Sequence, residues 1–139
     1  MFLLNLINDP ITAVAIIVGF IFVGLPIHEY AHGWMANRCG DPTAKMEGRL
    51  TLNPIDHIDP MGLISFLLIG FGWGKPVPIN PRYFHNKKDE LKVAIAGIAA
   101  NLLVALILAI PIRIATAKGI IVSSSIGLEL INYIVYVNI

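Results

Sequence analysis

The stretch GLPIHEYAHGW, residues 24–34, places three ionisable side chains at the end of a long apolar run. Between residues 11 and 27 the only polar side chain is that of Thr12. An apolar run of this length is at the lower limit for a helix that crosses a bilayer. The sequence therefore predicts a membrane helix over residues 11–37 that carries His28, Glu29 and His32 inside the membrane.

The boundaries of this first helix are marked by residues that start, bend or end helices. Asp9 and Pro10 form a suitable start, because proline is favoured in the first helical turn. Pro26 is expected to kink the helix just before the histidines, since proline cannot donate to the carbonyl four residues earlier. The glycine and proline within residues 38–42 are expected to end the helix.

The composition is that of a membrane protein. Hydrophobic residues make up 56% of the 139-residue chain, charged residues 14%, and the mean hydropathy is +0.74. The net charge of +1 gives no basic field, so no nucleic-acid partner is expected. Cys39 is the single cysteine, which excludes an internal disulfide and a thiolate metal site made by cysteine alone. Residues 1–9 have no basic segment typical of a signal peptide, so we interpret the apolar run as retained membrane structure.

The remaining segments predict an all-α, multi-pass membrane protein that forms a single domain over residues 1–139. Residues 44–81 are interpreted as a polar loop. Within it, residues 49–52 alternate like a strand, and the apolar residues 61–73 are too short to span a membrane. This loop is therefore expected to contain a short re-entrant or β-hairpin segment.

Two further core helices are expected after the loop, which makes about three transmembrane helices in all. Residues 92–112 are apolar, and their small residues favour close packing against a neighbouring helix. Residues 120–139 are predicted to begin a third helix.

The distribution of lysine and arginine predicts the orientation in the membrane. If residues 61–73 re-enter without crossing, eight basic residues share one side: Arg38, Lys45, Arg49, Lys75, Arg82, Lys87, Lys88 and Lys92. Arg113 and Lys118 lie on the other side. The positive-inside rule then places the N-terminus outside the cell membrane and the histidines toward the cytoplasmic side.

The spacing of the histidines points to metal chemistry. His28 and His32 are four residues apart, so on a helix both imidazoles lie on nearly the same face and can reach one ion. Glu29 follows the first histidine, where it can hold a water molecule and take its proton, as in zinc peptidases. The alternative is a simple polar cluster without metal, which is costly at membrane depth. We therefore predict one catalytic zinc ion.

Three stretches together resemble the site-2 proteases, a family of intramembrane zinc metalloproteases, particularly its compact bacterial type. They are HEYAHGWMANRCGDPTAKMEGRLTLNPIDHIDPMG (residues 28–62), FGWGKPVPINPRYF (71–84) and AIAGIAANLL (94–103). The resemblance implies that His28 and His32 are zinc ligands and that Glu29 is catalytic. Gly97 and Asn101 match the family's glycine-to-asparagine motif, although the proline that often follows this glycine is Ile98 here.

The resemblance also implies a role for Asn101 and a third ligand. Asn101 is expected either to donate to the substrate carbonyl or its oxyanion, or to join two helices by a hydrogen bond. The third zinc ligand in this family is an aspartate in a Leu-Asp-Gly motif on a later helix, and this sequence has no such motif. We interpret the chain as ending before that ligand, which would lie beyond residue 139.

Four other residues are local candidates for completing the site if the chain has no later ligand: Asp56, His57, Asp59 and His85. His57 and Asp59 either line the site or shape a turn, because Asp-Pro and Asn-Pro pairs are good turn formers.

The predicted function is hydrolysis of peptide bonds in transmembrane protein or peptide substrates. The extended residues 77–80 offer an edge for strand addition by an unwound substrate. The alternative is a non-catalytic membrane protein that binds zinc or a partner helix. A small transporter is disfavoured, because its polar residues would be spread over several spans.

Overall fold

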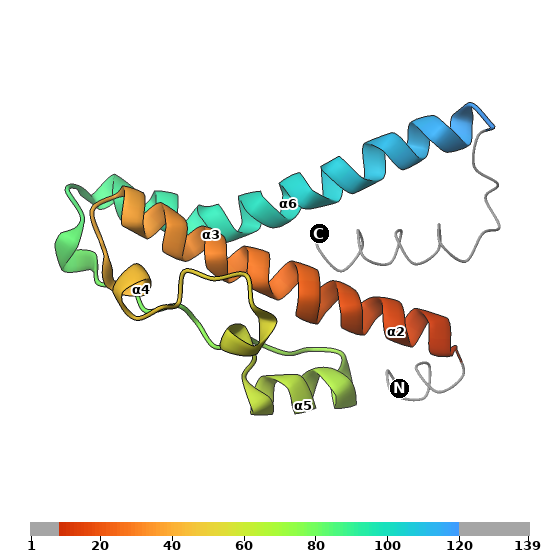
Figure 1. Cartoon of the computed structure of the whole chain (residues 1–139), viewed down its shortest axis with the longest axis horizontal. Helices are drawn as coiled ribbons and strands as arrows, with labels where there is room; N and C mark the ends of the chain where they lie inside the picture. Colours follow the sequence, from red (N-terminus) through yellow and green to blue (C-terminus); the bar gives the residue numbers. More distant parts are fainter. Residues whose placement is uncertain (1–8, 120–139) are drawn as a thin grey trace.

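Two long helical rods form the framework of the protein (Figure 1). The computed structural model describes residues 9–119. The first rod consists of α2 (Pro10–Val18), the π-helical η1 (Gly19–Gly24) and α3 (Leu25–Arg38), and the second rod is α6 (Lys87–Ala117). Helix α6 packs along α3 and diverges from α2, so the core between the rods lies at the α3 end. The connection contains four short elements: α4 (Thr43–Met46), η2 (Pro54–His57), α5 (Pro60–Ile69) and η3 (Pro81–Tyr83).

The helix predicted over residues 11–37 begins at Pro10 and ends at Arg38. Instead of a sharp kink at Pro26, the rod contains the π-helical turn η1 directly before it. This turn ends at Gly24, two residues before the proline. The N–H of Leu25 donates to the carbonyl of Phe20, five residues earlier, and Pro26 has no N–H to donate. The wider π-helical turn thus accommodates the proline, which lacks a backbone donor, and the rod continues through α3 without a break (Figure 1).

Both rods have the length and composition of membrane-spanning helices, over Ala13–Arg38 and Lys87–Ala117. Only 33% and 17% of their most apolar windows are buried within the protein. A core helix of a soluble protein would be mostly buried, so these exposed apolar surfaces fit contact with lipid. The all-α fold class is confirmed for the described residues, which contain helices and no strand. The third helix predicted over residues 120–139 lies outside the described residues.

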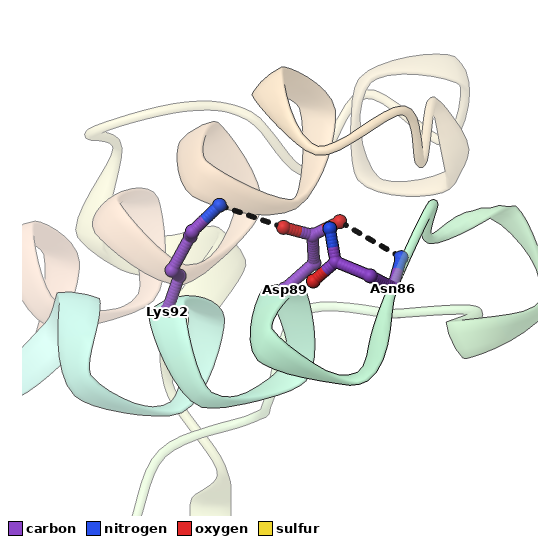
Figure 2. Close-up of polar contacts among 3 residues, drawn as sticks. All are labelled: Asn86, Asp89 and Lys92. Atoms are coloured by element: carbon purple, nitrogen blue, oxygen red, sulfur yellow. Dashed lines mark hydrogen bonds and ion pairs between the residues drawn. The ribbon is translucent and has the colours of Figure 1, made fainter.

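Helix α6 extends beyond the predicted residues 92–112 at both ends. It begins at Lys87, because Asp89 caps the first turn: its Oδ2 accepts from the Asn86 N–H at 3.2 Å (Figure 2). The Asp89 Oδ1 accepts from Lys92 Nζ at 2.8 Å, so these charges stabilise the helix start. At the other end the helix passes Pro111 and continues to Ala117.

At the segment predicted to be re-entrant or a β-hairpin, the connection forms one helix, α5, followed by a non-helical return. Residues 49–52 form no strand, and the one β-bridge within residues 9–119 joins Ile58 to Gly74. Asp59 caps α5 by accepting from the N–H groups of residues 61 and 62, each at 2.9 Å. After α5 the chain doubles back so closely that a Cβ on Gly62 would lie 2.0 Å from the carbonyl oxygen of Trp73. The β-hairpin alternative was therefore wrong, because the segment turns back as helix plus extended chain.

Asp41, which is fully buried just after the end of α3, holds in place the returning loop, residues 70–86 between α5 and α6. Its Oδ2 accepts from the Asn80 N–H at 2.7 Å, and its Oδ1 accepts from the Thr43 N–H at 3.0 Å. These bonds fix the loop against the polar end of the first rod.

Replacing Asp41 with alanine is expected to lower the free energy of unfolding by about 2–4 kcal/mol. The substitution leaves the partly buried N–H groups of Asn80 and Thr43 without acceptors, each at a cost of about 1–3 kcal/mol. Denaturation of the purified protein in detergent, followed by circular dichroism, measures the change. Glu47→Ala, at an exposed position, is the control and should change the value by less than about 0.5 kcal/mol.

Candidate metal centre

His28 and His32 lie one turn apart on α3 and their imidazole tips converge. The two Nε2 atoms are 2.9 Å apart, and the rings meet edge to face with centroids 4.6 Å apart. Zinc–nitrogen bonds are ~2.0–2.1 Å long, so two nitrogens on one ion are at most about 4.2 Å apart. The histidine pair therefore fits a single zinc ion.

A backbone carbonyl of α6 sets the protonation pattern of His32. The Nδ1 atom of His32 lies 2.6 Å from the carbonyl oxygen of Val93. A carbonyl can only accept, so Nδ1 carries the hydrogen and donates it, and Nε2 keeps a free electron pair. Metal-binding histidines are commonly oriented in this way by a hydrogen bond from the other ring nitrogen. His28 makes its own hydrogen bond to the backbone of Gly97, in the next turn of α6.

Gly97 provides the space that the two rings occupy. A Cβ atom added at this position would lie 2.6 Å from His32 Nε2 and 2.7 Å from His28 Nε2. Even an alanine would therefore collide with both candidate ligand atoms. The absence of a side chain at Gly97 forms a cradle for the imidazole tips between α3 and α6.

Glu29 lies beside the histidine pair and contacts the returning loop. Its Oε2 accepts from the Val77 N–H at 3.0 Å. Pro76 and Pro78 have no N–H, so Val77 supplies the only backbone donor within this Pro-Val-Pro segment. This bond fixes one carboxylate oxygen and holds the side chain next to the imidazoles.

Two cavities meet at Glu29. The smaller, about 230 Å³, is also lined by His28, Asn101 and segments of η1 and the returning loop. The Oδ1 of Asn101 is buried and has no hydrogen-bond partner among residues 9–119. The larger cavity, about 410 Å³, lies on the His32 side and has mostly apolar walls. The site is thus open on both sides of the carboxylate.

The four local candidates are not brought to this site as metal ligands. Within residues 9–119, no group of three His, Cys, Asp or Glu residues could hold a metal ion. His57 is fully buried in the connection, where its Nε2 donates to the Thr51 carbonyl at 2.7 Å. Asp59 caps α5, and His85 is exposed beside Gly40. Asp56 is half-buried in η2. The third ligand implied by the resemblance was expected beyond residue 139, outside the described residues.

Cys39, the residue that follows α3, has a packing role between α3 and α6. It is buried against α6, and its thiol donates to the Asp89 carboxylate. Burial raises the pKa of the Cys39 thiol, and the negative charge of Asp89 raises it further. The thiol therefore stays protonated and joins the end of α3 to the start of α6.

Two curated bacterial proteins match most of this chain. "Putative zinc metalloprotease YwhC" from Bacillus subtilis (strain 168) is 46% identical over 101 residues, which cover 70% of this chain and 45% of that protein. "Putative zinc metalloprotease Rip2" from Mycolicibacterium smegmatis is 32% identical over 100 residues, covering 68% of this chain and 38% of that protein. No family model and no solved structure matches the chain.

The resemblance to the site-2 protease family, stated from the motifs, is confirmed by these relatives. The chain spans less than half of the length of either relative.

Replacing Gly97 with alanine is expected to weaken zinc binding about 10- to 100-fold, because the new Cβ displaces both imidazole tips. The helices themselves should remain packed, since the colliding atoms are the ends of side chains. Competition with a chromophoric chelator measures the affinity. Gly48→Ala is the control: its φ of +69° makes alanine strained, but nothing lies within 4 Å of the added Cβ. Equal loss of zinc in both variants would contradict the cradle at Gly97.

Proposed function

We propose that this chain is the membrane-embedded part of an intramembrane zinc metalloprotease that hydrolyses peptide bonds of transmembrane substrates. The observation that carries the proposal is the convergence of the His28 and His32 Nε2 atoms, 2.9 Å apart, beside the Glu29 carboxylate. The zinc metalloprotease names of the two relatives support it. The two apolar rods, which have the length and composition of membrane-spanning helices, support a position of this polar cluster within a membrane.

Zinc would be held by His28, His32 and a third ligand from outside the described residues. When bound, it supplies Lewis-acid activation of a water molecule and of the scissile carbonyl. The residues of this chain contribute the orientation of the ligands: Val93 fixes the tautomer of His32, and Gly97 seats both rings.

Glu29 acts as the general base in this proposal. Its Oε2 is held by the Val77 N–H, so the side chain cannot turn away from the histidines. The carboxylate takes the proton of the attacking water and returns it to the leaving amide nitrogen, which lets the C–N bond break.

Asn101 positions the substrate carbonyl. It is on α6 one turn beyond Gly97, and it lines the smaller cavity together with His28 and Glu29. Its buried Oδ1 accepts no hydrogen bond from a neighbouring helix among the described residues, which argues against an interhelical bond through this oxygen and supports the catalytic alternative. The amide group is then available to a peptide that enters this cavity.

The substrate must present an extended peptide, because the peptide bonds of a helix are hydrogen-bonded internally. Residues 75–80 run beside Glu29 as irregular chain, and an unwound peptide could add along this segment mainly through the segment's carbonyl groups, since three of its N–H groups are already bonded. By the positive-inside rule, the site lies toward the cytoplasmic side, from which water reaches it.

The alternative function is a non-catalytic membrane protein that binds zinc or a partner helix. The finding that favours it is that residues 9–119 contain no third metal ligand for His28 and His32. Glu29 distinguishes the protease from the non-catalytic protein, because only the protease requires a general base beside the metal.

Glu29→Gln is expected to lower kcat by about 10²–10⁴-fold while zinc stays bound, because glutamine keeps the shape but cannot take a proton. Cleavage of a model transmembrane peptide in detergent and metal analysis of the same preparation provide the two readouts. Loss of zinc together with activity would assign Glu29 a structural role. A parent protein that binds zinc and cleaves none of the peptides would favour the non-catalytic alternative.

Asn101→Ala is expected to lower kcat/KM about 10²–10³-fold with little change in stability. A single donor aimed at a developing oxyanion contributes this much, whereas the residue makes no hydrogen bond within residues 9–119 through Oδ1. Peptide cleavage and thermal unfolding of the same variant are compared. A marked loss of stability with unchanged kcat/KM would show that Asn101 joins helices instead.

A further inference from the structure

The larger cavity begins at the candidate site and extends away from it on the His32 side. Glu29 and His32 form one wall, and most of the rest is apolar. The returning loop contributes Pro76, Val77, Ile79, Pro81 and Phe84, and α6 contributes Val93, Ala94 and Glu90. At about 410 Å³ the cavity is near the lower limit of ~300–1,000 Å³ for ligand pockets, which suits a large side chain.

One face of α6 connects this cavity to the rest of the site. Asn101, Gly97, Ala94 and Glu90 follow each other at spacings of three or four residues, so they lie along the same side of the helix. From Asn101 to Glu90, these four residues run from the apolar middle of α6 toward its charged first turns, which begin at Lys87. Glu90 is exposed at the far end of the cavity, and no ion pair engages it in the described part of the chain.

We propose that this cavity selects the substrate, an inference that rests on the proposed protease function. It receives the side chain next to the scissile bond on the His32 side, and it favours a large apolar side chain there. Glu90 favours a basic residue a position or two further along the peptide. The substrate class is therefore a peptide cleaved where an apolar membrane segment meets its basic flank.

The physical basis is complementarity along a single peptide. An apolar side chain in this cavity leaves water and covers the walls formed by Val77, Ile79 and Val93. A lysine or arginine beyond it meets the Glu90 carboxylate at the membrane surface, where the pair is exposed and salt screens it. The apolar preference should therefore be the larger of the two.

The test uses the purified full chain loaded with zinc and a panel of peptides that contain one apolar segment with a charged flank. Mass spectrometry locates the cleaved bond, and the residues on both sides are varied among Leu, Phe, Ala and Asp. On one side of the bond, kcat/KM is expected to favour Leu or Phe over Asp by about 10- to 100-fold. Lysine in the flank should be favoured over glutamate by a few-fold at low salt, and less at high salt.

Two matched pairs of variants test the cavity itself. Ala94→Trp, or the milder Ala94→Leu, fills the cavity and should shift the preference from Leu or Phe to Ala. Ala99→Trp makes the same change at an exposed position of α6 outside the cavity and should keep the original ranking. Glu90→Lys should reverse the flank preference, whereas Glu47→Lys, at an exposed position away from the cavity, should not.

Binding of the same peptides to the Glu29→Gln variant gives a readout that does not need cleavage. A ranking of Leu above Asp that Ala94→Trp abolishes supports the cavity, even if the parent chain cleaves nothing and the protease function fails. Cleavage with a ranking that both Ala94 variants leave unchanged overturns the proposed cavity and leaves the protease function standing. A flank preference unaffected by Glu90→Lys overturns the role of Glu90.

Discussion

The close approach of α6 to α3 at Gly97 is the constraint on which the candidate site depends. The two imidazole tips fill the space where any other residue would place a side chain, within 2.7 Å of the position of its Cβ. The same approach brings the Val93 carbonyl, one turn earlier, to 2.6 Å from His32 Nδ1. The histidine motif therefore lies on α3, but its orientation and protonation are set by α6. Neither helix alone would present two Nε2 atoms to one ion.

Three backbone N–H groups fix the returning loop: one bonds to η2, one to α3 of the first rod and one to Asp41, just after this rod ends. The N–H of Lys75 donates to the His57 carbonyl at 2.7 Å, that of Val77 to Glu29 and that of Asn80 to Asp41. Pro76 and Pro78 have no N–H, so the segment offers few alternative bonds that would let it shift register. This attachment couples the position of the proposed base to the position of the proposed substrate edge. A substitution of Asp41 that releases the loop would therefore also shift the Val77 N–H that holds the Glu29 carboxylate.

The sequence predicts the parts of this site that follow from helical periodicity, and it misses those that depend on the backbone. The spacing of His28 and His32 puts both on one face, and the motif resemblance adds Gly97 and Asn101. The Val93 carbonyl and the Val77 N–H carry no residue signal, because every residue has a carbonyl and most have an N–H. The flanking prolines of Val77 were the one available hint. The alternating residues 49–52 form no strand, because alternation indicates a face and supplies no partner to pair with.

The polar groups of the site differ in how they are satisfied, and this difference bears on function. His32 Nδ1 and Glu29 Oε2 each have a backbone hydrogen-bond partner. Asn101 Oδ1 has no partner among residues 9–119, at a cost of about 1–3 kcal/mol for a buried polar atom. This cost is offset when a hydrogen-bond donor enters the cavity from outside the helix pair. A backbone N–H of a peptide beside Glu29 is such a donor, so the unsatisfied asparagine oxygen supports the protease function independently of the histidine spacing.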